Sequence, residues 1–531
     1  MKYPTFVQDY LENSARLYPN KEALIAGKER LTYSTINQYS DQLALFLLGI
    51  GITRNDRVII YMDNSSETVI SVYGILKAAG VFVVINSQVK ASKLSYIIKD
   101  SGASVIITHV SKSNVIEKTF NDITNQVKII WVGSKLSIPK SLLSSSFSWD
   151  DLFNNINKQE YSAYKRSNEL DRIKAGCIDL DLAALTYTSG STGEPKGVMS
   201  THINIISAAQ SIIQYIENIE DDIILDTLPL SFDYGLYQVI MAFIFGGTVV
   251  LEKSFIFITD IIKLIQKEQI TGFPIVPTII AMLLKIKNLK KYDFSSLRYI
   301  TNTGAALPVE HIKRIRNELP DVRIFSMFGL TECKRVCYLP PDEIDRRPGS
   351  VGKAMPNCEV FIVDENEQEV KPGEVGELVV RGSNVMKGYW NSPDLTAKYF
   401  RPGLNFSENL LFTGDYFKKD TEGYLYFLGR KDDMIKSRGE RLSAKEIENV
   451  IYQIEGIIEV AVIGVPDEIL GQVIKAYIVK DSDFKIAQKD VLKYCSQHLE
   501  SFAIPKYIEF VDKIPKTPHG KIDKLTLNKN H

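Results

Sequence analysis

The residues best suited to chemistry lie in one run of small and hydroxylated side chains, residues 185–198, which reads LTYTSGSTGEPKGV. Small residues let backbone N–H groups and hydroxyls wrap polyphosphate oxygens, and Lys196 adds a positive charge. The run is not a Walker A loop, because no glycine directly precedes Lys196 and no Ser or Thr directly follows it. A flexible surface loop can have the same composition. The pattern nevertheless favours phosphate binding. The expected contacts are Thr188, Ser189, Gly190, Ser191, Thr192, Gly193 and Lys196.

Four further motifs follow along the chain. They are FGLTE at 328–332, TGD at 413–415, GRKDD at 429–433 with RGER at 438–441, and PKTPHGK at 515–521. With the phosphate loop, they resemble the signature of the adenylate-forming superfamily, which includes acyl-CoA synthetases, peptide-synthetase adenylation domains and luciferases. The resemblance covers nearly the whole chain. It implies an enzyme that uses ATP and Mg²⁺ to activate a carboxylic acid as an acyl-AMP and then transfers the acyl group to a thiol.

The resemblance also implies roles at the nucleotide. Glu332 would be the magnesium ligand, since Mg²⁺ prefers carboxylate and phosphate oxygens. Phe328, where the family commonly has tyrosine, would stack on adenine. Asp415 would accept hydrogen bonds from the ribose hydroxyls, although an aspartate in TGD is also a common turn residue. The other residues implied at the nucleotide are Gly304, Ala305, Ala306, Thr331 and Arg430.

Lys521 resembles the catalytic lysine that approaches the substrate carboxylate and the α-phosphate. A cation is needed there because negative charge gathers as the carboxylate attacks phosphorus, and Lys196 and the magnesium held by Glu332 would help to offset it. Asp432 resembles the hinge about which a small C-terminal domain turns between the two half-reactions. After that turn, Gly439 would lie at the tunnel through which the thiol arrives.

The acid pocket is predicted from residues 228–235, LPLSFDYG. Asp233 matches the aspartate with which amino-acid-activating relatives bind the α-ammonium group. A buried carboxylate is costly unless a cation neutralises it, which favours an amino acid substrate. Alternatively, Asp233 caps a helix and the acid is a fatty or aryl acid joined to coenzyme A. The residues expected near the substrate side chain are Tyr234, Tyr237, Met327, Arg335 and Val336.

The run TECKRVCYLPP at 331–341 most resembles stand-alone ligases that load an amino acid onto a separate carrier protein, among them the proline activators of anatoxin-type pathways. It favours L-proline as the acid and a phosphopantetheine arm as the acceptor, with coenzyme A as the alternative. An inactive nucleotide-binding scaffold is disfavoured, because such a protein has no need of the full motif set. That set is Lys196, Glu332, Asp415, Arg430 and Lys521.

The elements that must position these residues can be inferred from the pattern of apolar residues. From about residue 30 to 108, and again after residue 175, short runs rich in β-branched residues alternate with segments whose apolar residues recur with the period of a helix. Such βαβα alternation predicts mostly parallel sheets. Residues 352–428 change to short strands with Gly and Pro turns, which predicts a β-subdomain. The expected α/β fold has a large N-terminal domain at 1–431, built of two mostly parallel α/β layers plus the β-subdomain, and a small mobile α+β domain at 432–531.

Charge and patterning limit the partners. The 531 residues include 63 Lys plus Arg and 64 Asp plus Glu, so a net charge of -1 gives no broad attraction to nucleic acid or anionic membrane. The N-terminus lacks a secretory apolar region, and the apolar stretch at 239–251 is shorter than the roughly 20 residues of a spanning helix. We therefore expect a cytoplasmic protein without nucleic-acid or membrane partners.

Overall fold

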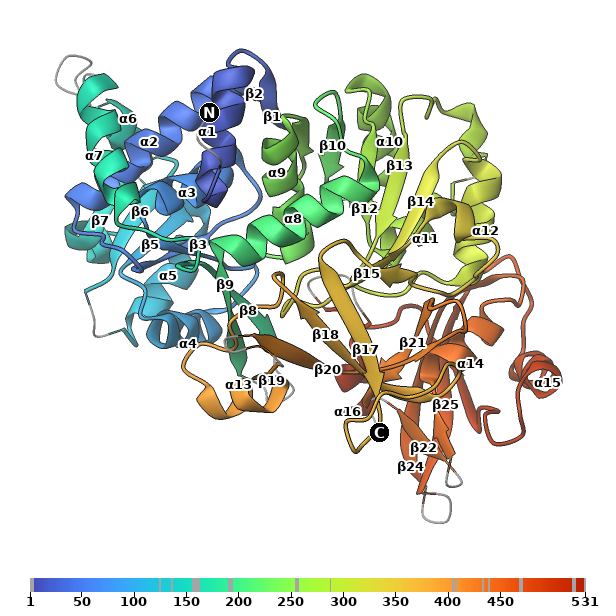
Figure 1. Ribbon diagram of the computed structural model, residues 1–531. Coiled ribbons are helices and arrows are strands. Elements are labelled where there is room, and N and C mark those ends of the chain that lie inside the picture. The colour runs from blue at the N-terminus through green and yellow to red at the C-terminus, as the bar shows by residue number, and fades with distance from the viewer. Residues whose placement is uncertain are drawn as a thin grey trace.

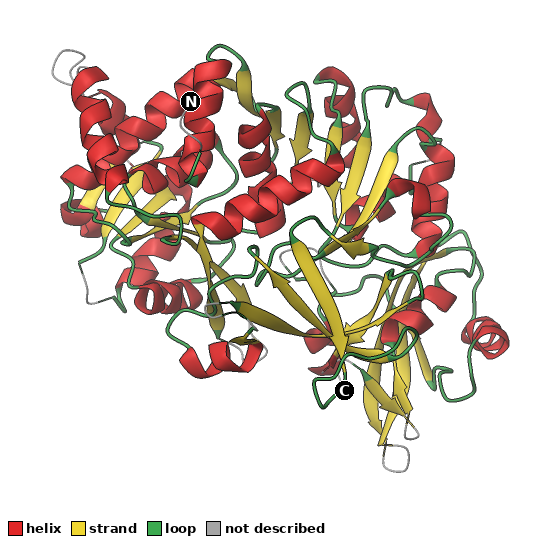
Figure 2. Cartoon of the chain, in the orientation of Figure 1, coloured by secondary structure: helices red, strands yellow, loops and turns green. Residues whose placement is uncertain are grey.

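The computed structural model describes residues 4–529 except 124–125, 135–136, 155–162, 190–193, 254–256, 287, 404, 406–407, 432–433, 438–439, 468–470 and 518–521. Figure 1 shows two helix-covered sheets in the N-terminal part and strand-rich layers toward the C-terminus. Figure 2 shows the same contrast by secondary structure. Within the described residues, no helix is both long enough and apolar enough to cross a bilayer.

The first sheet has seven strands in the order β7-β6-β5-β3-β4-β8-β9. Their bounds are β3 Arg57–Tyr61, β4 Val81–Val84, β5 Val105–His109, β6 Lys128–Val132, β7 Ser146–Ser148, β8 Leu182–Ser189 and β9 Pro195–Thr201. All neighbours are parallel except β8 and β9, which form an antiparallel hairpin. The continuous apolar runs of β3 and β5 reflect burial on both faces.

The helices around this sheet fall on two sides. They are α2 (Tyr33–Gly49), α3 (Ser66–Lys77), α4 (Ala91–Ser101) and α5 (Ser113–Phe120). Val58 and Ile60 of β3 belong to the large core that also holds residues of α2 and α3. Ile59 belongs to a second core with residues of α4 and α5. Because successive side chains of a strand point to opposite faces, this alternation places the two helix pairs on opposite sides of the sheet.

The second sheet has nine strands in the order β16-β15-β14-β13-β12-β10-β11-β1-β2, with a parallel centre. Their bounds are β1 Glu22–Ala26, β2 Glu29–Thr32, β10 Ile223–Asp226, β11 Thr248–Leu251, β12 Gly272–Ile275, β13 Tyr299–Asn302, β14 Arg323–Phe328, β15 Cys337–Leu339 and β16 Lys353–Ala354. The carboxyl ends of parallel strands meet at one edge of a sheet. The loops after β10, β13 and β14 therefore converge.

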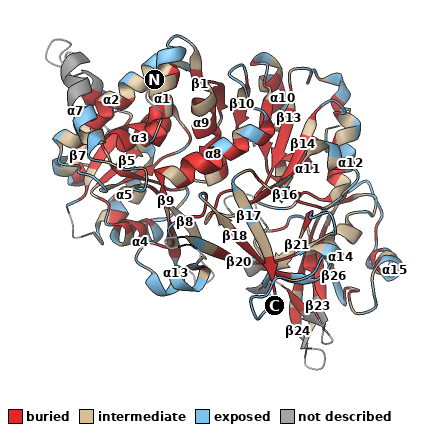
Figure 3. Ribbon diagram, viewed as in Figure 1, coloured by how far each residue is buried: buried red, intermediate tan, exposed pale blue. Residues whose placement is uncertain are grey.

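Two helices lie between the sheets: α8 (His202–Ile216) and α9 (Asp233–Phe245). Figure 1 shows α8 running along the seam, and one hydrophobic core joins residues of both sheets with residues of both helices. Figure 3 shows that buried residues fill this seam and the central strands. The packing fixes the start of α9, which carries Asp233, relative to the loops of the second sheet.

The β-subdomain is an antiparallel sheet of five strands. Their bounds are β17 Cys358–Val363, β18 Val375–Gly382, β19 Phe400–Pro402, β20 Asn409–Lys419 and β21 Leu425–Arg430. The hairpin of β20 and β21 sets Asp415 directly opposite Arg430. This is the region where the change to short strands with Gly and Pro turns predicted hairpins.

The last sheet contains β22 Ile435–Ser437, β23 Glu440–Leu442, β24 Ile457–Asp467, β25 Gly471–Lys480 and β26 Tyr507–Phe510. It packs with α14 (Ala444–Ile451) and α15 (Gln488–His498) around a core of its own. Ser443 caps α14, its side chain accepting a hydrogen bond from the Glu446 N–H. The predicted fold class is confirmed, with parallel sheets, a large N-terminal domain and a smaller C-terminal domain. The boundary at residues 431 and 432 stays a prediction.

Candidate active site

The predicted phosphate loop joins β8 to β9, which pair as a hairpin. Thr188 of β8 pairs directly with Lys196 of β9, so the lysine stands where the two strands meet the loop. Gly190, Ser191, Thr192 and Gly193 lie outside the described residues, as does the side chain of Ser189. Strand β9 is braced from its other side, where the N–H of Trp390 donates to the Gly197 carbonyl at 2.7 Å.

Glu332 lies in the loop after β14 and is held by the neighbouring chain. Tyr389 Oη donates to Glu332 Oε1 at 2.7 Å, and the Met386 N–H donates to the Glu332 carbonyl at 2.9 Å. Tyr389 also forms a β-bridge with Val198 of the phosphate hairpin. Burial, and next the charge of Glu332, raise the pKa of Tyr389, so the phenol stays protonated and donates. Tyr389 thus links the hairpin to the acidic residue.

Glu332 fits a magnesium ion that arrives with a nucleotide. Its carboxylate is half-buried and oriented by Tyr389. The described part of the chain has no group of three or more His, Cys, Asp or Glu side chains that could hold a metal. Mg²⁺ needs only one or two protein carboxylates when phosphate oxygens and water complete its shell.

The residues predicted to bind adenine and ribose lie beside or within the β-subdomain. The half-buried ring of Phe328 packs on Phe417 at 4.9 Å and on Phe427 at 5.6 Å between centroids. Arg430 Nε lies 3.2 Å from Asp415 Oδ1. The Asp415 side chain is 6% exposed, whereas that of Arg430 is 60% exposed. An aromatic ring, a carboxylate and an exposed cation are groups that suit a nucleotide.

The small-residue segment predicted beside adenine follows β13. Gly304 adopts φ +82°, a left-handed conformation that glycine tolerates best. Asn302 Nδ2 donates to the Ala305 carbonyl at 3.0 Å and holds the turn. Ala305 is exposed and Ala306 is half-buried. The turn therefore presents a surface without bulky side chains where adenine is predicted to bind.

A small cavity, partly open to solvent, lies between the start of α9 and these loops; the empty space there, open solvent included, is about 400 Å³. Its lining residues are Ile212, Phe232, Asp233, Tyr234, Tyr237, Thr303, Gly304, Gly329, Leu330, Thr331, Lys334 and Arg335. The structure thus brings four of the predicted acid-binding residues together with two predicted nucleotide residues. The acid and the nucleotide would meet at Gly304 and Thr331.

Asp233 is the first residue of α9, and Phe232 is the N-cap, so the carboxylate does not cap the helix. Lys334 Nζ lies 3.4 Å from Asp233 Oδ2, with side-chain exposures of 5% and 11%. The same ammonium lies 5.2 Å from the centroid of the Tyr237 ring. The chain itself therefore supplies a cation to Asp233. A substrate ammonium would be a second cation at this carboxylate, and that role of Asp233 stays a prediction.

Tyr234 and Arg335 form the neighbouring wall. Tyr234 Oη donates to the Thr301 carbonyl at 2.8 Å, which fixes the ring. The Arg335 guanidinium lies 5.2 Å from the centroid of that ring. Arg335 Nε is buried and has no hydrogen-bond partner among the described residues. A buried, incompletely satisfied guanidinium points to an acceptor group on whatever fills the cavity.

Met327 and Val336 lie in the protein core and are not among the residues that line the cavity. Met327 Sδ accepts a hydrogen bond from Tyr215 Oη at 2.9 Å. Val336 is fully buried beside Cys333 and Cys337. Their direct contact with the acid stays a prediction, as do the roles of Lys521, Asp432 and Gly439, which lie outside the described residues.

Two site residues were missed in the sequence. Lys334 was noted only as part of an unusual run, and Tyr389 was not noted at all. Lys334 and its partner Asp233 are separated by 101 positions in the chain, and Tyr389 and its partner Glu332 by 57 positions. The only sequence signals were a basic pair directly after the FGLTE motif and an aromatic pair at 389–390.

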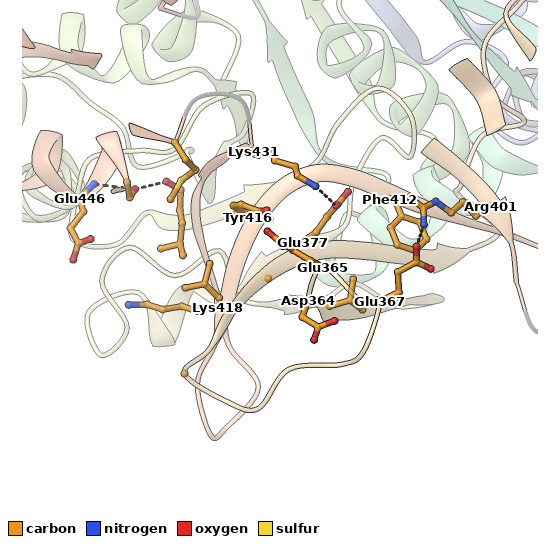
Figure 4. A pocket seen from close by; sticks show the side chains of 17 residues that line it. Asp364, Glu365, Glu367, Glu377, Arg401, Phe412, Tyr416, Lys418, Lys431 and Glu446 are labelled. Carbon is orange, nitrogen blue, oxygen red and sulfur yellow. Dashed lines mark hydrogen bonds and ion pairs between the residues drawn. The ribbon is translucent and has the colours of Figure 1, made fainter. Parts of the chain in front are cut away.

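A larger cleft of about 1230 Å³ lies between the β-subdomain and the start of the C-terminal elements (Figure 4). Figure 4 shows mainly charged side chains there, including Lys431 facing Glu377 at 3.8 Å. Exposed ion pairs of this kind contribute little stability. None of the predicted nucleotide or acid residues lines this cleft, so it is separate from the candidate site.

The family model of AMP-binding enzymes matches residues 11–390, and that of the AMP-binding enzyme C-terminal domain matches residues 446–521. The long-chain-fatty-acid–CoA ligase of Bacillus subtilis (strain 168) is 33% identical over 527 residues, covering 97% of this chain and 93% of that protein. Gramicidin S synthase 2 of Brevibacillus brevis is 30% identical over 530 residues, covering 98% of this chain and 11% of that protein.

Solved structures show the same relationship. The anthranilate CoA ligase AuaEII in complex with anthranoyl-AMP has a TM-score of 0.88 and 26% identity, covering 100% of this chain and 99% of that one. ATP-bound MatB from Rhodopseudomonas palustris has a TM-score of 0.82 and 26% identity, covering 98% of each chain.

The chain therefore belongs to the AMP-binding enzyme family, and its predicted membership of the adenylate-forming superfamily is confirmed. It is an AMP-forming acid–thiol ligase that carries out ATP-dependent adenylation with Mg²⁺.

Proposed function

We propose that this ligase adenylates a compact amino acid, with L-proline as the first candidate, and transfers the aminoacyl group to the phosphopantetheine thiol of a separate carrier protein. The observation that carries the proposal is the Asp233 carboxylate, which lines the same cavity as Gly304 and Thr331. An amino acid whose carboxylate faces the nucleotide there would present its ammonium group to Asp233.

The charge of the cavity supports a polar acid. Three of its lining side chains, Asp233, Lys334 and Arg335, are charged. A long alkyl chain placed there would remove water from these charges without offering hydrogen bonds, which is costly. The fatty acid named for the Bacillus subtilis relative is therefore a poor candidate here.

In the first half-reaction, the substrate carboxylate attacks the α-phosphate of ATP in line and pyrophosphate leaves. Lys196 lies at the base of the phosphate hairpin and offsets charge on the leaving group. Magnesium, held by Glu332, would neutralise phosphate charge when bound. Asp415 accepts from the ribose, and Lys521 is assigned to the reacting carboxylate and phosphate.

In the second half-reaction, the C-terminal domain turns about Asp432, which withdraws Lys521 and brings Gly439 to the acyl-AMP. The thiol then attacks the acyl carbonyl and gives up its proton to solvent, a C–S bond forms, and AMP leaves with the electron pair of the broken C–O bond. The mixed anhydride is activated enough for a thiol to need little further help.

A coenzyme A ligase for a small aryl or alkyl acid is the second candidate. One observation favours it: Lys334 already neutralises Asp233, so an acid without an amine can enter the cavity without leaving that carboxylate unpaired. AuaEII, which has a similar fold, is named as an anthranilate CoA ligase.

Exchange of labelled pyrophosphate into ATP tests the proposal. The acids would be the amino acids including L-proline, together with benzoate, acetate and a medium-chain fatty acid. Exchange with one amino acid supports the proposal, and exchange only with a non-amino acid supports the second candidate. Mass spectrometry of holo-carrier protein and of coenzyme A after a full turnover then identifies the acceptor.

A further inference from the structure

We infer that Lys334 determines specificity in the acid pocket. Its ammonium is a built-in counter-ion for Asp233, and its presence sets how strongly the enzyme prefers an acid with an α-ammonium group over the same acid without one. For the amino acid substrate, this inference rests on the proposed function.

The geometry makes Lys334 an exchangeable partner of Asp233. Both side chains are at least 89% buried, so the pair is desolvated. The separation of 3.4 Å exceeds the roughly 2.7–2.9 Å of a strong charge-assisted hydrogen bond. The ring of Tyr237 stabilises the ammonium from a second side. A better-placed substrate ammonium can therefore take the carboxylate while Lys334 keeps an aromatic contact.

The backbone gives no reason for a lysine at this position. Lys334 adopts φ +62°, a left-handed conformation in which glycine or asparagine is less strained. The turn is tight, since a Cβ on Gly329 would lie 2.2 Å from the Lys334 carbonyl oxygen. Strain at a buried, charged residue is explained if the side chain has a function in the pocket.

The charge balance gives the direction of the effect. With Lys334 present, a neutral acid leaves Asp233 compensated, whereas an amino acid must displace the lysine first. Without Lys334, Asp233 loses this buried cation until a substrate ammonium binds, so binding of neutral acids is penalised and binding of amines is favoured. Lys334 thus widens the range of acids that the pocket accepts.

The test compares L-proline with cyclopentanecarboxylate, which has nearly the same shape and no amine, in pyrophosphate exchange. In Lys334→Met, the ratio of the two kcat/KM values should rise about tenfold or more in favour of proline. Lys334→Asn removes the same charge and suits the left-handed backbone, so it covers the case in which the Met variant folds poorly. A ratio within about twofold of wild type in both variants would overturn the inference.

Two controls isolate the pair. In Asp233→Asn/Lys334→Met, the rise should vanish, because no carboxylate remains to be exposed; a rise that persists would contradict the inference. Lys77→Met removes another buried lysine, 2% exposed and 2.5 Å from Asp41 on helices outside the cavity lining. It should leave the ratio unchanged, and an equal shift there would show that the effect is not local.

The outcome also separates this inference from the proposed function. If wild type exchanges with no amino acid, the proposed function fails. Lys334→Met should then lower kcat/KM for the acid that is used by about tenfold, and adding Asp233→Asn should restore it. Unchanged kinetics with that acid would overturn the role of Lys334 independently.

Discussion

The ribose site and the acid pocket each pair one buried carboxylate with one cation, yet the cations differ in exposure. Asp415 faces Arg430 at 3.2 Å, and Asp233 faces Lys334 at 3.4 Å. The Arg430 side chain is 60% exposed, whereas that of Lys334 is 5% exposed. An exposed cation leaves its partner at little cost, but removal of a buried one leaves a charge unpaired. If the assigned roles hold, the predicted ribose site should accept a nucleotide at little cost, whereas the predicted acid pocket should discriminate between substrates.

The substitution with the largest expected effect lowers catalysis equally for all acids, so it does not distinguish the ribose site from the acid pocket. Lys521→Ala should lower the rate of adenylation by about 10²–10³-fold with every acid, since it removes charge stabilisation at the reacting phosphate. ATP binding and thiol transfer from supplied acyl-AMP should remain nearly intact. Pyrophosphate exchange and single-turnover thioester formation measure the two steps, and equal loss of both would contradict the assigned role.

The next change breaks the acid pocket alone. Asp233→Ala should lower kcat/KM for the preferred amino acid by about 100-fold, because about 3 kcal/mol of ion pairing with a buried ammonium is lost. The KM for ATP should not change. Steady-state pyrophosphate exchange at varied acid and ATP gives both constants. Unchanged kinetics with the best amino acid would show that the ammonium binds elsewhere.

The third change breaks the ribose site alone. Asp415→Asn should raise the KM for ATP by about tenfold, corresponding to the loss of one charge-assisted hydrogen bond. The increase should be the same for every acid, because Asp415 is not among the residues that line the acid cavity. The same exchange assay with proline and a neutral acid checks this, and a change in acid preference would mean that the two sites are coupled.

The smallest effect concerns the support of the magnesium ligand. Tyr389→Phe removes the hydrogen bond to Glu332 and should weaken the apparent affinity for Mg²⁺ about fivefold, or about 1 kcal/mol. Tyr399→Phe is a matched control, because its ring packs on Tyr389 with centroids 6.2 Å apart. Magnesium titrations of the exchange rate compare the two. Equal shifts would indicate a general effect of losing a nearby hydroxyl and not a hydrogen bond to the ligand.

The relative positions of the predicted nucleotide residues follow from local rules, for a physical reason. Asp415 and Arg430 face each other because the β20–β21 hairpin sets their register. The pairing of β8 with β9 likewise places Lys196 directly opposite Thr188. Parallel strands bring the loops after β13 and β14 to one edge whatever their detailed shape. Positions that depend on local rules of this kind can be inferred from sequence motifs and from the alternation of predicted strands and helices.

The pair of Asp233 and Lys334 depends on information that no local pattern contains. It requires the packing of α9 against the second sheet and a left-handed turn at a lysine, a residue type that rarely adopts it. Met327 and Val336 are predicted near the substrate side chain. The structure places both in the core and not among the residues that line the cavity, and their direct contact with the acid stays a prediction.

The most direct test of the account is a crystal structure with a non-hydrolysable prolyl-adenylate analogue, prolyl sulfamoyl adenosine. The account predicts the ribose at Asp415, the prolyl nitrogen about 3 Å from the Asp233 carboxylate, and Lys334 moved away from that carboxylate. A structure in which Lys334 stays on Asp233 while the prolyl nitrogen binds elsewhere would contradict it.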